Sequence, residues 1–96
     1  MTVTRFARFH VDPSGADEML SRRAALVDGI RQRFPGLIEA RLTRVDERTW
    51  VDVWRWESRA DLQRALAGGP TVAEAPAVFA LTEDLSTEDA DDVDQR

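Results

Sequence analysis

The sequence TWVDVWRWE, residues 49–57, alternates between a tryptophan-rich face and a valine-rich face, which is the two-residue period of a β-strand. One face of this predicted strand carries Trp50, Asp52, Trp54 and Trp56, and the other carries Val51, Val53 and Arg55. Residues 37–45 alternate in the same way, with Ile38, Ala40 and Leu42 on one face. Since only Asp46-Glu47-Arg48 separates the two runs, the sequence predicts a β-hairpin.

A strand and a long helix are predicted before the hairpin. The stretch VTRFARFHV, residues 3–11, predicts a strand with one face formed by Val3, Arg5, Ala7, Phe9 and Val11 and the other by Thr4, Phe6, Arg8 and His10. A helix is predicted over residues 15–33, between Asp12-Pro13-Ser14 and Phe34-Pro35-Gly36. Its apolar positions repeat at threes and fours, and its charged positions are expected to face water: Arg22, Arg23, Asp28, Arg31 and Arg33.

After the hairpin the sequence predicts a second helix and a weak last strand. The helix is expected over residues 59–67, from the near capping box Ser58-x-x-Asp61 to the stop at Gly68-Gly69-Pro70. The strand is expected near residues 87–93. The order is then β-α-β-β-α-β, the ferredoxin-like plan of the α+β class, in which both helices cover one face of an antiparallel sheet.

The bare face of such a sheet carries Phe6, Val51 and Val53. An exposed apolar sheet surface favours association. We therefore expect two copies to pack their sheets face to face in a symmetric homodimer.

Length, charge and composition limit the class of protein. The 96 residues suit a single domain over 1–85, followed by an acidic tail over 86–96. Seven of the 18 acidic residues lie from Glu83 onward, which argues against partners such as nucleic acid or an anionic membrane. The chain has no cysteine, no membrane-length apolar run and no signal-peptide pattern, so a cytoplasmic location is expected. The single histidine, His10, is interpreted as a polar strand residue, and no metal site is predicted.

Asp52 is the unusual residue of the tryptophan-rich face, because a carboxylate among aromatic rings is costly unless it is paired or solvated. One interpretation is a buried ion pair, for which Arg5 on the neighbouring strand is a candidate partner. The other is a pocket where tryptophans stack on an aromatic ligand and Asp52 handles a proton. Replacing Asp52 with asparagine separates them, since loss of an ion-pair partner destabilises the fold.

The stretches VTRFARFHVDPSG, residues 3–15, and WVDVWRWESRADLQRALAGG, residues 50–69, resemble the antibiotic biosynthesis monooxygenase family of dimeric α/β barrels. The resemblance extends from Val3 to about Leu85. It implies a homodimer. Members of this family that oxidise aromatic polyketides do so with oxygen and without a cofactor. The family site implies a tryptophan, matched by Trp56, and an asparagine and a tyrosine, whose places are taken by Asp52 and Leu62. It also implies an arginine, and none occurs between Gly68 and Leu81.

Haem-degrading relatives imply an asparagine and a histidine where this chain has Ala7 and residues 73–76, so haem cleavage is not expected. The leading hypothesis is a cofactor-independent monooxygenase acting on a small aromatic or polyketide-like molecule. Asp52 and Trp56 are its candidate catalytic residues. Its candidate substrate-binding residues are Arg5, Ala7, Phe9, Trp50, Trp54, Leu62 and Phe79. The alternatives are a non-redox binding or cyclase/isomerase-type protein and a structural dimer without catalysis.

Overall fold

The computed structural model describes residues 1–68 and 72–96. In chain order its elements are β1 (Val3–His10), a 3-10 turn (Pro13–Gly15), α1 (Ala16–Arg33), β2 (Leu37–Arg44), β3 (Thr49–Trp56), α2 (Arg59–Gly68), α3 (Ala75–Phe79) and β4 (Glu83–Asp91). The predicted helices and hairpin are present to within a residue or two of their expected ends. Part of the predicted stop at Gly68-Gly69-Pro70 lies outside the described residues.

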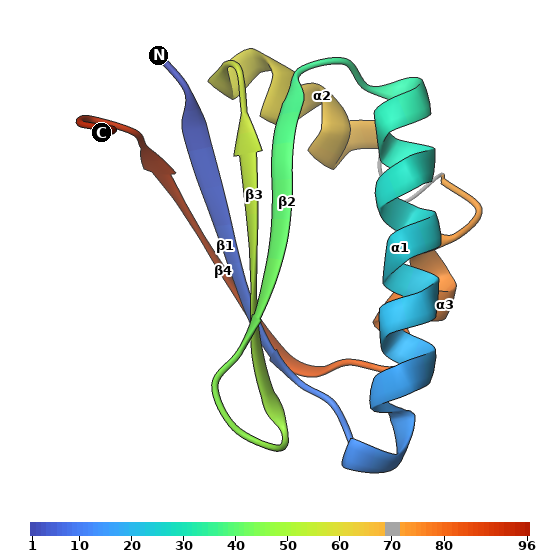
Figure 1. Ribbon diagram of the computed structural model, residues 1–96. Coiled ribbons are helices and arrows are strands. Elements are labelled where there is room, and N and C mark those ends of the chain that lie inside the picture. Colours follow the sequence, from blue (N-terminus) through green and yellow to red (C-terminus); the bar gives the residue numbers. More distant parts are fainter. Residues whose placement is uncertain (69–71) are drawn as a thin grey trace.

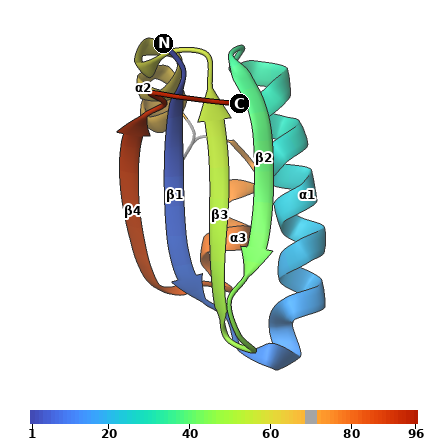
Figure 2. The same cartoon turned by 60° about the vertical axis from the view of Figure 1, so that its left-hand side comes forward.

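The four strands form one antiparallel sheet in the order β2-β3-β1-β4. The helices of the described residues all lie on one side of this sheet and leave its other side bare, as Figure 1 shows. Figure 2 shows β4 as the edge strand beside β1, with α1 behind β2 at the opposite edge. The ferredoxin-like plan expected from the sequence is therefore confirmed. No helix within the described part of the chain is both long enough and apolar enough to cross a membrane.

The pairing of β1 with β3 puts side chains on the two faces as predicted. Ala7 pairs with Asp52 and Arg5 with Trp54 on the face covered by helices, while Phe6 pairs with Val53 on the bare face. Phe6 is 40% exposed, whereas Trp56 on the covered face is 2% exposed. The core thus lies between the sheet and the helices.

The prediction that Ile38 shares one face of β2 with Ala40 and Leu42 is wrong. The register of β2 with β3 shifts between Leu37 and Glu39, so that Leu37 pairs with Trp56 and Ala40 with Trp54. This irregularity resets the alternation. Leu37 therefore packs against the core in place of Ile38, which is exposed.

The last strand begins earlier than the sequence predicts, at Glu83, and it pairs with β1 almost along its length. All nine of its residues are exposed, so no apolar alternation marks it in the sequence. Backbone pairing and polar contacts hold it instead: Arg5 with Asp89, His10 with Asp84 and Arg59 with Asp91. Half of the expected acidic tail is thus part of the sheet.

Asp92 fastens the end of β4 to the start of β1. The hydroxyl of Thr2 donates to Asp92 Oδ2 at 2.6 Å, and that of Thr4 donates to Oδ1 at 2.7 Å. The backbone N–H of Asp92 also donates to the Thr2 carbonyl oxygen at 3.0 Å. The two hydroxyl bonds favour the carboxylate form and hold the pKa of Asp92 below its usual value of 3.8.

This contact predicts a specific pH dependence. Because folding lowers the pKa of Asp92, its contribution to stability is complete above about pH 4 and is lost as the pH falls further. We expect the Asp92→Asn variant to lose less stability on acidification than the unmodified protein. Thermal melts of both proteins between neutral and acidic pH measure the difference, and parallel curves would refute the role of this carboxylate.

Candidate functional site

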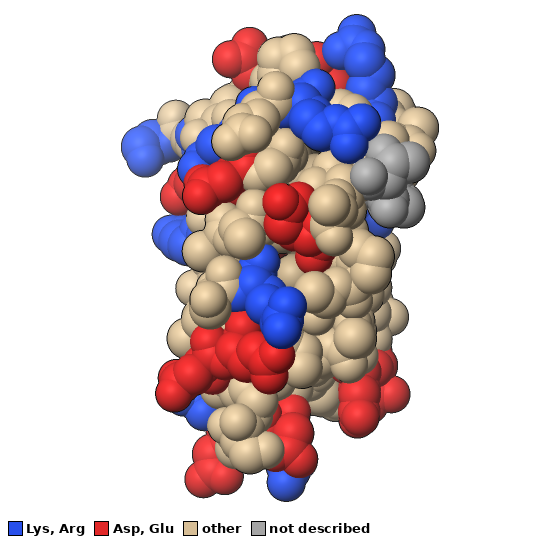
Figure 3. Space-filling model, turned by 90° about the vertical axis from the view of Figure 1, so that its right-hand side faces the viewer, with Lys and Arg blue, Asp and Glu red and all other residues tan. Residues whose placement is uncertain are grey.

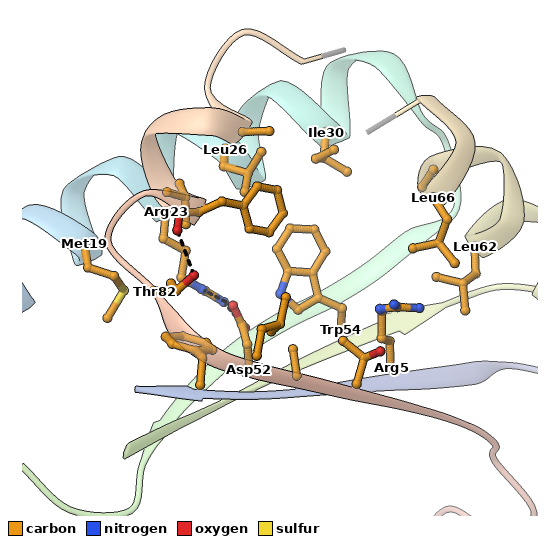
Figure 4. Close-up of a pocket in the computed structure, with 18 of the residues that line it drawn as sticks. Arg5, Met19, Arg23, Leu26, Ile30, Asp52, Trp54, Leu62, Leu66 and Thr82 are labelled. Atoms are coloured by element: carbon orange, nitrogen blue, oxygen red, sulfur yellow. Dashed lines mark hydrogen bonds and ion pairs between the residues drawn. The ribbon is translucent and has the colours of Figure 1, made fainter. Parts of the chain in front are cut away.

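A cavity of about 250 Å³ lies between the covered face of the sheet and the helices. Strands β1, β3 and β4 form its floor and helices α1, α2 and α3 form its walls (Figure 4). The lining is apolar except for three charged residues and two threonines. Those five are Arg5, Arg23, Asp52, Thr82 and Thr87. Eight of the nine residues named from the sequence line it: Arg5, Ala7, Phe9, Asp52, Trp54, Trp56, Leu62 and Phe79.

Trp50 is the exception, because it does not line the cavity. It is 6% exposed and belongs to a separate buried cluster with Phe9, Val11 and Met19. The guanidinium of Arg44 lies 4.9 Å from its ring centroid, in a cation–π contact. Trp50 therefore packs the end of the sheet, and only two of the three tryptophans border the cavity.

Trp54 and Trp56 stack on one another because they are two residues apart on the same strand face. Their ring centroids are 6.5 Å apart and their planes differ by 26°. Trp56 is almost fully buried, and its Nε1–H is among the buried groups without a hydrogen-bond partner in the described residues. Trp54 is half-buried and projects into the cavity (Figure 4). One indole thus supports the other, which offers a flat face to a ligand.

Asp52 forms a buried ion pair with Arg23 of α1. Arg23 Nε donates to Asp52 Oδ2 and Nη2 donates to Oδ1, both at 2.8 Å. The two side chains are only 14% and 10% exposed. This bidentate geometry is the strongest form of an arginine–carboxylate contact.

Two expectations about these charges are wrong. Arg23 does not face water, and Arg5 is not the partner of Asp52. The sequence indicated that Arg23 is buried, because it lies on one stripe of the helix with three apolar residues, Met19, Leu26 and Ile30. All four residues line the cavity. An arginine within an apolar stripe indicates a buried acidic partner.

Arg5 instead binds the edge strand. Its Nη1 lies 3.0 Å from both carboxylate oxygens of Asp89. Both side chains are partly exposed, at 23% and 26%. In Figure 4 the two arginines lie on opposite sides of Trp54, so the cavity has two separate polar ends. Each end is neutral, because each arginine has an acidic partner.

The mouth of the cavity is bordered by side chains that line it and also reach solvent. These are Leu66 of α2, Phe79 of α3 and Leu85 of β4, between 40% and 52% exposed. On the face seen in Figure 3, acidic and basic side chains are interspersed and neither sign dominates. Sequence analysis missed Leu66 and Leu85, because α2 and β4 meet here only through the fold.

The family model for antibiotic biosynthesis monooxygenases matches residues 2–72. The chain therefore belongs to the antibiotic biosynthesis monooxygenase family. No protein with a curated description matches this chain.

Solved structures of several proteins share this fold. A mutant of SnoaB, a cofactor-independent oxygenase from Streptomyces nogalater, is 24% identical, with a TM-score of 0.79 over 98% of this chain and 95% of its own. A Caulobacter crescentus CB15 protein assigned to the antibiotic biosynthesis monooxygenases is 21% identical, with a TM-score of 0.81 over 97% and 91%. Rv0793 from Mycobacterium tuberculosis is 18% identical, with a TM-score of 0.77 over 99% and 98%. At these identities the likeness shows the fold.

Proposed function

We propose that this protein is a monooxygenase that needs no cofactor and acts on a small aromatic or polyketide-like substrate. Family membership supports the reaction class, and SnoaB provides a precedent on the same fold. The observation that carries the proposal is the cavity, about 250 Å³ of space in a chain of 96 residues. A core that served packing alone would be filled.

The lining suggests a role for each of the main residues. Trp54 stacks on the flat substrate, and Trp56 holds Trp54 in place from below. Asp52 accepts the proton or hydrogen bond of the substrate. Each of its oxygens receives one N–H from Arg23, and a carboxylate has further lone pairs for a ligand.

The proposed reaction draws its electrons from the substrate. A ring carbon beside aromatic or carbonyl groups loses a proton to Asp52, and the carbanion reacts with O₂ to give a peroxide anion. This anion takes the proton back from Asp52 and becomes a hydroperoxide. Loss of water then leaves a carbonyl group, so that R₂CH₂ + O₂ gives R₂C=O + H₂O. The apolar walls keep bulk water from the anion.

We also propose that the protein works as a homodimer, as the sequence suggests. The bare face of the sheet holds Phe6 and Val53 on adjacent strands, and Val51 borders a shallow groove beside Phe6. A second sheet packed there would bury this apolar surface. Sedimentation at micromolar concentration tests the proposal, which a stable monomer would overturn.

Oxygen uptake with 9-anthrone and with 1-naphthol tests the function. The proposal predicts uptake above the uncatalysed background, with one mole of carbonyl product per mole of O₂ from 9-anthrone. The Arg22→Met variant is a matched control, because Arg22 pairs with Glu18 on the exposed side of α1. Quenching of tryptophan fluorescence by both compounds without oxygen uptake would favour a non-redox binding or isomerase-type protein. Absence of both would leave a structural dimer.

A further inference from the structure

Arg23 keeps unused hydrogen-bond donors at the cavity. Its Nε and one N–H of Nη2 are bound to Asp52. No residue in the described ranges 1–68 and 72–96 accepts a hydrogen bond from Nη1. A guanidinium presents five N–H groups in a planar fork, so Nη1 and the second N–H of Nη2 form a further edge, directed away from Asp52.

We infer that this open edge of Arg23 binds the substrate oxygen on which negative charge develops, so that Arg23 is the oxyanion donor of the site. The inference rests on the proposed function and adds a binding residue to it. Asp52 orients Arg23 through two hydrogen bonds, so the donor is fixed before the ligand arrives. Preorganised donors of this kind stabilise developing negative charge without reorganisation.

The charges balance along this path. In the resting site the guanidinium of Arg23 is neutralised by Asp52. When Asp52 takes the proton from the substrate carbon, the negative charge moves to the substrate oxygen at the open edge. Arg23 therefore has one negative partner before and after proton transfer. The step avoids leaving an unpaired charge in a buried place, which would be costly.

Arg5 is the competing anion site, because it also lines the cavity and has N–H groups that no described residue uses. The structure favours Arg23 for two reasons. Its side chain and that of Asp52 are less exposed than those of Arg5 and Asp89, so a hydrogen bond to Arg23 is less weakened by water. Asp52 also lies beside Arg23, so base and oxyanion donor are adjacent.

The test is the ionisation of 4-nitro-1-naphthol bound to the protein without oxygen, followed through the visible absorbance of its anion. We expect binding to lower the pKa of the naphthol by about one unit, which corresponds to about tenfold tighter binding of the anion than of the neutral form. The methyl ether of the same compound cannot ionise and reports stacking alone.

Two variants remove the donor, since a single replacement of Arg23 would strand the Asp52 charge. The Arg23→Met/Asp52→Leu double variant replaces the pair with apolar groups, a change that buried ion pairs often tolerate. We expect it to lose the pKa shift and to bind the anion about tenfold or more weakly, with the methyl ether unchanged. Arg23→Lys keeps a positive charge beside Asp52 but lacks the second edge of N–H groups that a guanidinium has. This variant is expected to lose most of the shift in the naphthol pKa.

Two outcomes would overturn the inference: a pKa shift that persists in the folded double variant, or one that disappears in Arg5→Met alone. Arg22→Met controls for loss of positive charge from α1 and should behave as the unmodified protein. If the unmodified protein lowers the pKa of the bound naphthol but shows no oxygen uptake, the proposed function is refuted and the oxyanion site remains. Oxygen uptake that is unchanged in Arg23→Lys, which keeps Asp52, would refute the site and leave the function.

Discussion

Replacing Asp52 with asparagine is expected to lower the free energy of unfolding by about 3 kcal/mol. The substitution leaves the guanidinium of Arg23 with a neutral partner at a place where the side chain is only 14% exposed. Removing one member of a buried pair typically costs about 3–5 kcal/mol, and the lower end applies because the adjacent cavity can admit water. Urea unfolding of both proteins measures the loss.

The Arg23→Met/Asp52→Leu double variant is the control for this effect. It removes both charges, so its stability is expected to lie closer to that of the unmodified protein than to that of Asp52→Asn. An Asp52→Asn variant as stable as the unmodified protein would show that the pair does not contribute to stability. Oxygen uptake should fall in Asp52→Asn as well, because the amide is neither a base nor a charged partner for Arg23.

Replacing Trp56 with alanine is expected to cost about 4 kcal/mol, enough to unfold much of a small domain. Trp56 is 2% exposed and packs against residues of α1, α2 and α3 in the main core cluster. The loss includes both the apolar area and the void that remains. Trp56→Phe is expected to cost far less, because it keeps a ring and removes the unpaired buried Nε1–H.

Trp54→Ala is the matched comparison, since Trp54 is on the same strand face but only half-buried. The Trp54→Ala variant is expected to be more stable than Trp56→Ala. It is also expected to lose most of its affinity for aromatic ligands, because the stacking surface is gone. Circular dichroism melts and fluorescence titration with 1-naphthol separate the two effects. Equal loss of stability in both variants would contradict the assignment of support to Trp56 and of ligand contact to Trp54.

The parts of the fold that follow local periodicity are predictable from the sequence. The faces of residues 3–10 and 49–56 follow from alternation, and α1 ends where Phe34-Pro35-Gly36 predicts. Local periodicity fails at the start of β2, where the register shift moves Leu37 into the place expected for Ile38. It also fails at β4, because an edge strand held by backbone pairing and ion pairs needs no apolar pattern.

The strand residues of the candidate site could be predicted from alternation, and Leu62 and Phe79 of the helices were also named from the sequence. Asp52 and Trp54 follow from the alternation of one strand, and both line the cavity. The partner of Asp52 lies 29 residues earlier on α1, and nothing local connects Arg23 to it. The place of Arg23 in the apolar stripe of α1 indicates that it is buried, but only the packing of the helix on the sheet identifies Asp52 as its partner.

We propose that oxygen-dependent chemistry takes place in the cavity beside Asp52. The most direct measurement is the rate of ¹⁸O incorporation from ¹⁸O₂ into the carbonyl product of 9-anthrone, with the protein and with its Ala7→Phe variant. Ala7 lines the cavity and pairs with Asp52 across the sheet, so a phenyl group there occupies the proposed substrate volume. We predict labelled product above background with the unmodified protein and at least a tenfold lower rate with the folded variant, in line with the loss of a substrate contact. Equal rates in the two proteins, or no catalysed incorporation at all, would refute this proposal.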